Sequence, residues 1–217
     1  MKTRFLSLIV SLLMISVTWA ENAPNNQPMS LLDIQHRWAQ INYQLPENER
    51  EQAFISLIDS AKTLSNSQPD NAEYLAWLGI VESSTAGAIG GLKALSYVKE
   101  AKVVFEKVLE INPGVLSGTV YTSLGTLYHK VPGWPVSFGS DKTAKKMLIK
   151  AIEINPDGAD SNFFYAEFLF DNGDYKLAKK YLLIAQQAPA RPDRPLADSG
   201  RQQQISELLT KVEKKLS

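Results

Sequence analysis

The 217-residue chain is predicted to fold as an all-α helical-repeat protein. Apolar residues recur at helical spacing through most of the sequence, and no stretch shows the alternation of a half-buried strand. Three segments resemble one another and each ends near a proline, as in stacked helical repeats. The C-terminal segment, 196–217, carries one apolar stripe with polar residues behind it. That pattern is typical of a capping helix that closes a repeat array.

The first twenty residues have the features of a secretory signal peptide. Lys2 and Arg4 make a basic start, and an apolar run follows over 5–17. Small residues at Thr18 and Ala20 occupy the positions that signal peptidase reads. We expect cleavage after Ala20 and a periplasmic or secreted protein that does not span the membrane. An uncleaved N-terminal anchor is the alternative, although the run is shorter than the roughly 20 apolar residues of a membrane span.

The charge balance and the absence of cysteine exclude several kinds of partner and of stabilising bond. Without Lys2 and Arg4 the chain has 21 basic and 23 acidic residues, which argues against nucleic acid as a partner. The chain has no cysteine, so it has neither disulfides nor a lipid-anchored cysteine after the apolar run. We expect one domain that is held together by burial of apolar side chains.

The predicted organisation follows from these patterns. Segment 21–28 is polar with two prolines and is expected to be a flexible linker, and 29–217 is expected to be a single helical-repeat domain. Its parts are a degenerate helical hairpin at 29–70, three repeats at 71–113, 117–156 and 159–190, and the capping helix at 196–217.

Small residues recur where the two helices of a repeat should approach each other. In the last repeat, Ala166 and Ala178 are 12 positions apart, with Gly173 in the turn between them. The corresponding pairs are 19 apart in the second repeat and 22 apart in the first. Both stretched repeats are therefore expected to carry inserted turns, at 131–139 and at a flexible glycine-rich stretch, 85–91. Insertions in repeat arrays often lie on the binding face.

Two segments carry a more specific resemblance, 131–139 (VPGWPVSFG) and 188–201 (APARPDRPLADSGR), together with the lead-in 124–128 (LGTLY). Over roughly 72–205 the chain resembles tetratricopeptide-repeat proteins, in particular the T component of tetratricopeptide-associated TRAP transporter systems. The resemblance implies a right-handed solenoid in the periplasm, a solute-binding protein as partner and a small organic ligand. The mature chain departs from that pattern because it lacks a lipid-anchored cysteine, and nothing before Asn71 matches.

In the predicted array, the first helices of the repeats line a groove. Counting from the small residues places there Thr122, Thr126, His129, Phe163, Glu167 and Phe170. A neutral to mildly acidic groove with hydroxyl and phenyl groups suits a neutral small ligand or a helix from a partner. It lacks the basic residues that clamp a peptide carboxylate. Alternatively, Phe163 and Phe170 simply pack against the capping helix or an insertion.

Two further groups of residues have both a binding and a structural interpretation. Trp134 and Phe138, on a loop stiffened by prolines, would form an aromatic tip for a ligand or partner. The alternative, which we favour, is that the loop folds back and buries Trp134. Arg191, Arg194 and Arg201 form a basic cluster near Asp193 and Asp198. They would present guanidinium groups to an anion, or would join an internal ion-pair network that ties the last repeat to the capping helix, which we favour.

The sequence predicts no enzyme. It has no cysteine nucleophile, only two histidines and no motif of catalytic or metal-ligating residues, so no metal or cofactor is expected. An enzyme would require a buried pair between His129 and a carboxylate. The expected function is binding of a ligand or partner, and the resemblance implies an accessory role in TRAP-type transport. The alternative is an interaction or assembly scaffold of the cell envelope with no small-molecule ligand.

Overall fold

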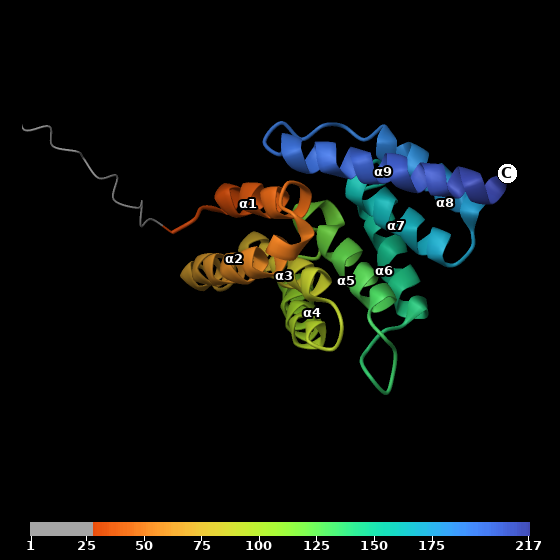
Figure 1. The fold of residues 1–217 in the computed structure, drawn as a ribbon. Helices are drawn as coiled ribbons and strands as arrows, with labels where there is room; N and C mark the ends of the chain where they lie inside the picture. The colour runs from red at the N-terminus through yellow and green to blue at the C-terminus, as the bar shows by residue number, and fades with distance from the viewer. Residues whose placement is uncertain (1–27) are drawn as a thin grey trace, which may run out of the picture.

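The computed structural model describes residues 28–217, and this part of the chain confirms the all-α prediction (Figure 1). The predicted signal peptide and nearly all of the predicted linker lie outside the described residues. The elements are α1 (Leu31–Tyr43), α2 (Glu47–Ser67), α3 (Ala72–Ile89), α4 (Ala94–Ile111), the 3-10 turn η1 (Val115–Gly118), α5 (Thr119–Lys130), α6 (Asp141–Ile154), α7 (Ala159–Asp171), α8 (Tyr175–Gln186) and α9 (Pro195–Leu216).

Helices α3 to α8 pack as three consecutive pairs, α3 with α4, α5 with α6 and α7 with α8. A glycine allows close approach in the first two pairs. A methyl group at Gly79 would lie 2.6 Å from the Phe105 ring, and one at Gly125 would lie 2.6 Å from Leu148 Cγ. In the third pair the corresponding residue, Ala166, is fully buried. The small residues found in the sequence therefore lie at the helix contacts.

The prediction of an inserted loop at 85–91 is wrong. Helix α3 continues to Ile89 and α4 begins at Ala94, so the connection is only four residues long. Gly90 and Gly91 make this turn with φ of 64° and 59°, a conformation that favours glycine. Gly87 lies within α3 and is exposed. The extra residues of the first pair lengthen its two helices instead of forming a loop.

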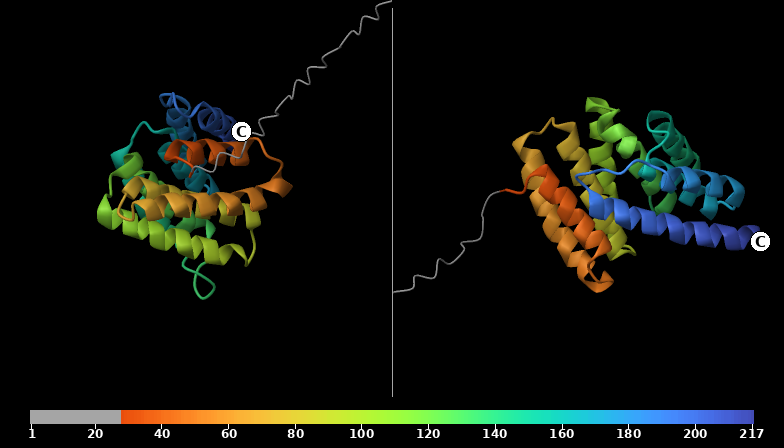
Figure 2. Two further views of the ribbon diagram at one scale, coloured as in Figure 1. Left: turned by 90° about the vertical axis from the view of Figure 1, so that its left-hand side faces the viewer. Right: turned by 90° about the horizontal axis from the view of Figure 1, so that it is seen from above.

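The second pair does contain an inserted loop. Residues 131–140 connect α5 to α6 and project from the body of the molecule as the long green loop in Figure 1. The same projection is visible in the left-hand view of Figure 2.

The first and last helices of the described chain meet over the repeats. Helices α3, α5 and α7 lie side by side, α1 packs on α3, α9 packs on α7, and α1 contacts α9. The view from above in Figure 2 shows α1 and α9 in front of the other helices. Trp38 Nε1 on α1 donates to Ser84 Oγ on α3 at 2.8 Å. A methyl group at Gly200 would overlap the Tyr43 ring. Helix α1 therefore covers part of α3 and α9 covers part of α7, and the two covering helices contact each other.

Candidate partner-binding surfaces

The α5 threonines predicted to line a groove are used within the protein. Thr122 is 3% exposed. Thr126 is half-buried, and its hydroxyl donates to the Thr122 carbonyl oxygen at 2.9 Å. A hydroxyl that bonds the preceding helical turn is a common arrangement for threonine in a helix. These two residues do not present free hydroxyl groups to a ligand.

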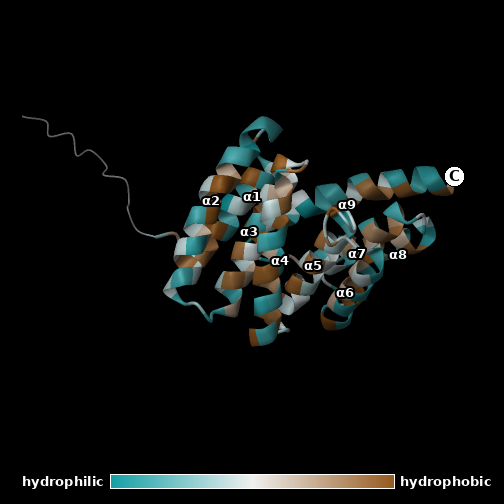
Figure 3. Cartoon of the chain, turned by 90° about the horizontal axis from the view of Figure 1, so that it is seen from below, coloured by the Kyte–Doolittle hydropathy of each residue, from teal (hydrophilic) through white to brown (hydrophobic). Residues whose placement is uncertain are grey.

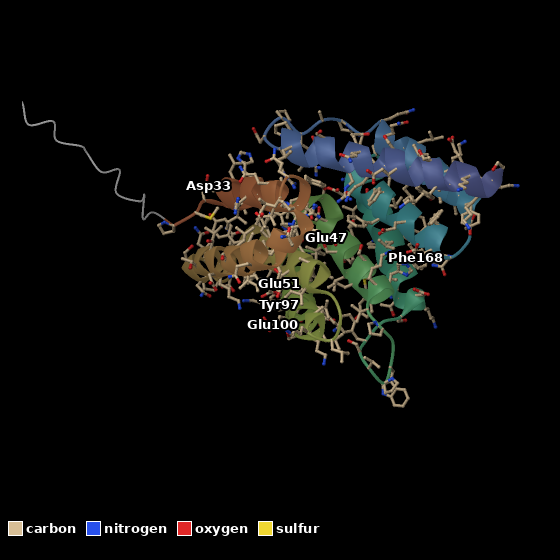
Figure 4. All side chains as sticks on the ribbon, in the orientation of Figure 1. Asp33, Glu47, Glu51, Tyr97, Glu100 and Phe168 are labelled. Carbon is tan, nitrogen blue, oxygen red and sulfur yellow. The ribbon has the colours of Figure 1, made fainter. Side chains whose placement is uncertain are left out.

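His129, at the end of α5, is held between two carboxylates. Its Nδ1 lies 2.7 Å from Asp141 Oδ1 at the start of α6, and its Nε2 lies 3.0 Å from Asp171 Oδ2 at the end of α7. The edge of its ring packs against Phe168 of α7, labelled in Figure 4, with centroids 5.0 Å apart. His129 thus ties three helices together.

Lys130 extends this cluster. Its Nζ lies 2.7 Å from Asp171 Oδ2 and 3.4 Å from Glu167 Oε1. Burial works to lower the pKa of Lys130, but the two carboxylates outweigh it and the pKa is raised. Burial likewise works to raise the pKa of Asp171, but its bonds from Lys130 and His129 leave the pKa below the ordinary value. Glu167, predicted to line a groove, instead belongs to this ion-pair cluster.

The His129 cluster meets only part of the condition set above for an enzyme. His129 lies within hydrogen-bonding distance of carboxylates, but the pairs are not buried, because the Asp141 and Asp171 side chains are 60% and 37% exposed. A general base also needs one ring nitrogen to face the substrate, and both nitrogens of His129 face carboxylates of the protein. Among residues 28–217, no group of histidine, aspartate and glutamate side chains is arranged to hold a metal ion. This geometry is that of a structural tie.

The two α7 phenylalanines predicted to line the groove, Phe163 and Phe170, pack within the protein. Phe163 is 6% exposed, and the guanidinium of Arg201 on α9 lies 4.5 Å from its ring centroid. Phe170 is half-buried beside Tyr175 of α8, with ring centroids 5.4 Å apart. The alternative in which Phe163 packs against the capping helix describes this geometry.

Arg191 and Arg201 form an ion-pair network with two aspartates. Asp160 accepts from Arg191 Nη1 at 2.8 Å and from Arg201 Nε at 2.7 Å, and Asp198 accepts from Arg191 Nε at 2.6 Å. Burial works to raise the pKa of Asp160, but Arg201 and Arg191 outweigh it and hold the pKa well below its usual range. The network joins α7, the segment before α9 and α9 itself, as the structural interpretation requires.

The favoured prediction that Arg194 also joins the ion-pair network is wrong, because its contacts are of another kind. Its guanidinium lies 4.8 Å from the ring centroid of Trp77 on α3, and no carboxylate in the described chain forms a salt bridge with it. Burial, and then the nearby charge of Arg191, lower its pKa. Stacking of a guanidinium on an indole is a favourable cation–π arrangement. Arg194 therefore packs the segment before α9 onto α3.

The 131–140 loop presents apolar side chains to solvent. Trp134 is 90% exposed and Val136 is 51% exposed, so the favoured prediction that Trp134 is buried is wrong. The prolines and glycines of the loop close it on itself, since Gly139 N–H donates to the Pro132 carbonyl at 3.0 Å and Val136 N–H to the Gly133 carbonyl at 3.1 Å. In this closed loop the Trp134 side chain lies at the tip and is exposed to solvent.

The base of the loop is anchored to the body of the protein. Ser140 N–H donates to the Tyr128 carbonyl oxygen at 2.8 Å. The Phe138 ring packs edge-on against Tyr128, with centroids 5.3 Å apart, and Lys102 Nζ of α4 lies 5.7 Å from the Phe138 ring centroid. Phe138 is therefore the anchor of the loop, and Trp134 and Val136 are its exposed tip.

A second surface was missed by the sequence reasoning. A hollow of about 870 Å³ lies along the outer side of α6. It is lined by Leu109, Tyr121, Lys142, Lys145, Lys146, Met147, Ile149, Lys150 and Glu153. A signal for it is present in the sequence, because Lys-x-Ala-Lys-Lys occurs at 142–146 and again at 176–180. The lysines flank the small anchor residue of each repeat.

Comparison with known proteins adds no assignment. No family model matches the sequence, and no curated protein matches it. In the described part of the chain, every helix is too short or too polar to cross a membrane. The function is therefore argued from the surfaces of the molecule.

Proposed function

We propose that this chain is an exported, tetratricopeptide-like scaffold that binds another protein through the 131–140 loop. The observation that supports this most directly is the exposure of Trp134, 90%, on a loop whose base is fixed to α5. A tryptophan buries roughly 150–250 Å² in a contact. At about 25 cal/mol per Å², that area corresponds to about 4–6 kcal/mol before the costs of association.

The fixed backbone of the loop favours this role. Association costs free energy when flexible segments become ordered. The hydrogen bonds across the loop and the packing of Phe138 on Tyr128 order it before any partner binds. Tryptophan is also enriched among the few residues that dominate the energy of protein interfaces. The loop tip is thus a preorganised anchor for a partner.

The contacts made by the candidate groove residues support partner binding over the binding of a small organic ligand. Helix α1 packs on α3, and α9 packs on α7. The candidate groove residues Thr122 and Phe163 are buried, and Glu167 contacts Lys130. These contacts are typical of a packed interior. The scaffold alternative, with no small-molecule ligand, is therefore the function that we propose.

The resemblance to the T component of TRAP systems suggests one class of partner, a periplasmic solute-binding protein. The three helix pairs with small residues at their contacts support a tetratricopeptide-like array. The loop tip, formed by Trp134 and Val136, has no charged residue. Such a tip suits a partner that offers an apolar pocket.

Site-specific crosslinking tests the proposal. A photoreactive amino acid at position 136 places the crosslinker beside Trp134 without removing it, and position 183, where Leu183 is 42% exposed on α8, serves as the control. In an envelope extract, we expect position 136 to capture a discrete protein that position 183 does not, and Trp134→Ala to abolish the capture. Equal capture at both positions, or none at 136, contradicts the proposal.

A second experiment separates the two candidate functions. The protein-free ultrafiltrate of the same extract retains small organic solutes and contains no protein partner. We expect it to leave the thermal unfolding of the chain unchanged. A rise in the unfolding temperature with the ultrafiltrate would favour the small-ligand function.

A further inference from the structure

The outer face of α6 carries lysines that are not neutralised within the protein. Lys142, Lys145 and Lys146 are exposed, and none of them forms a salt bridge with any residue in 28–217. Lys150, one turn further on, pairs with Glu153 at 3.0 Å. The half of the chain that contains α6 is the more basic one, because residues 114–217 contain 14 basic and 11 acidic residues, whereas residues 28–113 contain 7 basic and 11 acidic ones.

Apolar side chains accompany these lysines. Leu109 of α4, Tyr121 of α5 and Met147 of α6 line the same hollow and are half-buried, and Ile149 is 37% exposed. Figure 3, which views the molecule from below, shows apolar and polar residues alternating along α4 and α6. The volume of about 870 Å³ lies in the range typical of binding clefts. The hollow therefore combines apolar contact area with unpaired positive charge.

We propose that the hollow between α4, α5 and α6 binds an amphipathic helix with acidic flanks that belongs to the partner protein. This inference rests on the proposed partner-binding function and adds the chemistry of the partner. The apolar stripe of such a helix would contact Leu109, Tyr121 and Met147, and its carboxylates would pair with the lysines of α6. Helices bind grooves in this way through apolar residues at i, i+3, i+4 and i+7, and complementary charge favours the correct partner.

The shape of the surface favours a helix over a membrane. An anionic bilayer attracts lysines, but a nearly flat surface leaves a hollow of this size unfilled, and the apolar residues that line it would not be covered. A helix about 10 Å across fits a groove between helices. Helix α6 begins at Asp141, directly after the 131–140 loop. One partner is therefore expected to contact both the loop tip and the hollow.

The equivalent lysines on α8 provide a matched control. Lys176, Lys179 and Lys180 hold the same positions in their repeat. Their hollow is smaller, about 530 Å³, and includes Leu216 of α9. Lys179 already pairs with Glu213 at 2.9 Å. Reversing three charges on α8 changes the net charge as much as reversing three on α6, but it does not alter the proposed site.

The test uses a labelled synthetic peptide, a glutamate-rich helix with one leucine stripe, and measures its binding to the chain by fluorescence anisotropy. A scrambled peptide of the same composition, with its leucines spread around the helix, is the second probe. We expect the triple change Lys142→Glu, Lys145→Glu and Lys146→Glu to weaken binding of the amphipathic peptide about tenfold or more. The triple change Lys176→Glu, Lys179→Glu and Lys180→Glu should weaken it less than about threefold.

The outcomes are distinct. Equal losses in the two triple variants, or equal binding of the two peptides, would overturn the proposed site, because binding would then depend only on overall charge. A third outcome is that the chain binds phosphatidylglycerol-containing vesicles and not the peptide, and that the α6 variant loses vesicle binding. The ligand of the hollow would then be a membrane surface and not a helix. Trp134 is unchanged in both variants. Crosslinking from position 136 therefore still tests partner binding by the loop if the hollow does not bind the peptide.

Discussion

Arg201 on α9 donates a hydrogen bond from Nε to Asp160 Oδ1 on α7, across 2.7 Å. Only 7% of the Arg201 side chain is exposed, and its guanidinium also lies 4.5 Å from the ring centroids of Phe163 and Phe164. This contact fixes the last helix to the last pair. Helix α9 also contacts α1, so the Asp160–Arg201 pair helps to hold the last helix against both the last pair and the first helix.

Removing the charge of Asp160 should destabilise the protein. Asp160→Asn leaves Arg191 and Arg201 without their shared carboxylate, and breaking one partner of a buried pair costs about 3–5 kcal/mol. Because Asp160 is 26% exposed at its side chain, we expect a loss near the lower end, about 3 kcal/mol, in urea unfolding. Asp193→Asn, at an exposed position in the segment before α9 with no salt bridge in 28–217, should change the free energy of unfolding by less than about 0.5 kcal/mol.

The depressed pKa of Asp160 also predicts a dependence on pH. A carboxylate with a lowered pKa stabilises the fold above its unfolded pKa, here the ordinary 3.8, and that stability is lost as the pH falls through the folded value. Wild type and Asp160→Asn should therefore converge in stability below pH 3.8. A difference that persists unchanged at the lowest pH would show that the loss comes from packing and not from charge.

Glu82 is a buried carboxyl group with the opposite behaviour. It is 2% exposed, and its Oε2 has no hydrogen-bond partner in the described chain. Burial, and next the charge of Glu100 on α4 (labelled in Figure 4), raise its pKa from 4.5 to about 7, against a lowering by Lys62. Between pH 4.5 and 7 the unfolded chain gives up the proton that the folded chain keeps. Stability therefore falls as the pH rises through this window.

Glu82→Gln should remove this dependence. The shift corresponds to a destabilisation of about 3 kcal/mol above pH 7, so the variant should be more stable than wild type at pH 8 by about this amount. The two should match near pH 4, where Glu82 is protonated in both states. Equal slopes of unfolding free energy against pH for the two proteins would exclude the proposed cause. Glu73→Gln, at an exposed position on α3, is the control.

The sequence predicted the local features of the fold because they have local causes. Helical periodicity and the small residues Gly79, Gly125 and Ala166 predict the helix contacts that the structure contains. The length of α3 was not predictable in the same way. The glycines at 87, 90 and 91 indicated a loop, but only the last two make the turn, since packing of Thr85 and Ala86 in the core extends the helix.

The exposure and contacts of the candidate site residues could not be predicted from sequence patterns. Thr122 and Phe163 were predicted to line a binding groove, whereas both side chains are buried. No periodicity in the sequence indicates that α1 and α9 contact each other. The segment before α9 also contacts α1, since His36 Nε2 lies 2.7 Å from the Asp193 carbonyl oxygen although the two residues are far apart in the chain. The exposure of Trp134 was equally hidden, because the prolines and glycines around it are compatible with a loop that folds either way.

Two glycines in α3 should respond in opposite directions to alanine. Gly79→Ala places a methyl group 2.6 Å from the fully buried Phe105 ring, and such overpacking costs about 1–3 kcal/mol. Gly87→Ala meets no atom within 4 Å, so the higher helix propensity of alanine should stabilise the protein by about 0.5–1 kcal/mol. Urea unfolding measures both. If 85–91 were a flexible loop, Gly87→Ala would gain nothing.

The two aromatic residues of the 131–140 loop should differ in their effect on stability. Trp134 is 90% exposed, so Trp134→Ala should change the free energy of unfolding by less than about 0.5 kcal/mol. Phe138→Ala removes the contacts with Tyr128 and Lys102 and should cost about 1–2 kcal/mol, since the ring is only half-buried.

The same two variants distinguish the role of Phe138 in ordering the loop from the role of Trp134 in contacting the partner. Phe138→Ala loosens the base of the loop, so a partner would have to order the loop on binding, and crosslinking from position 136 should weaken although Trp134 is retained. Trp134→Ala should abolish the crosslink with no loss of stability. A loss of about 3–5 kcal/mol in Trp134→Ala would indicate a buried indole. The loop tip would then be part of the core, and the proposed partner-binding surface would be wrong.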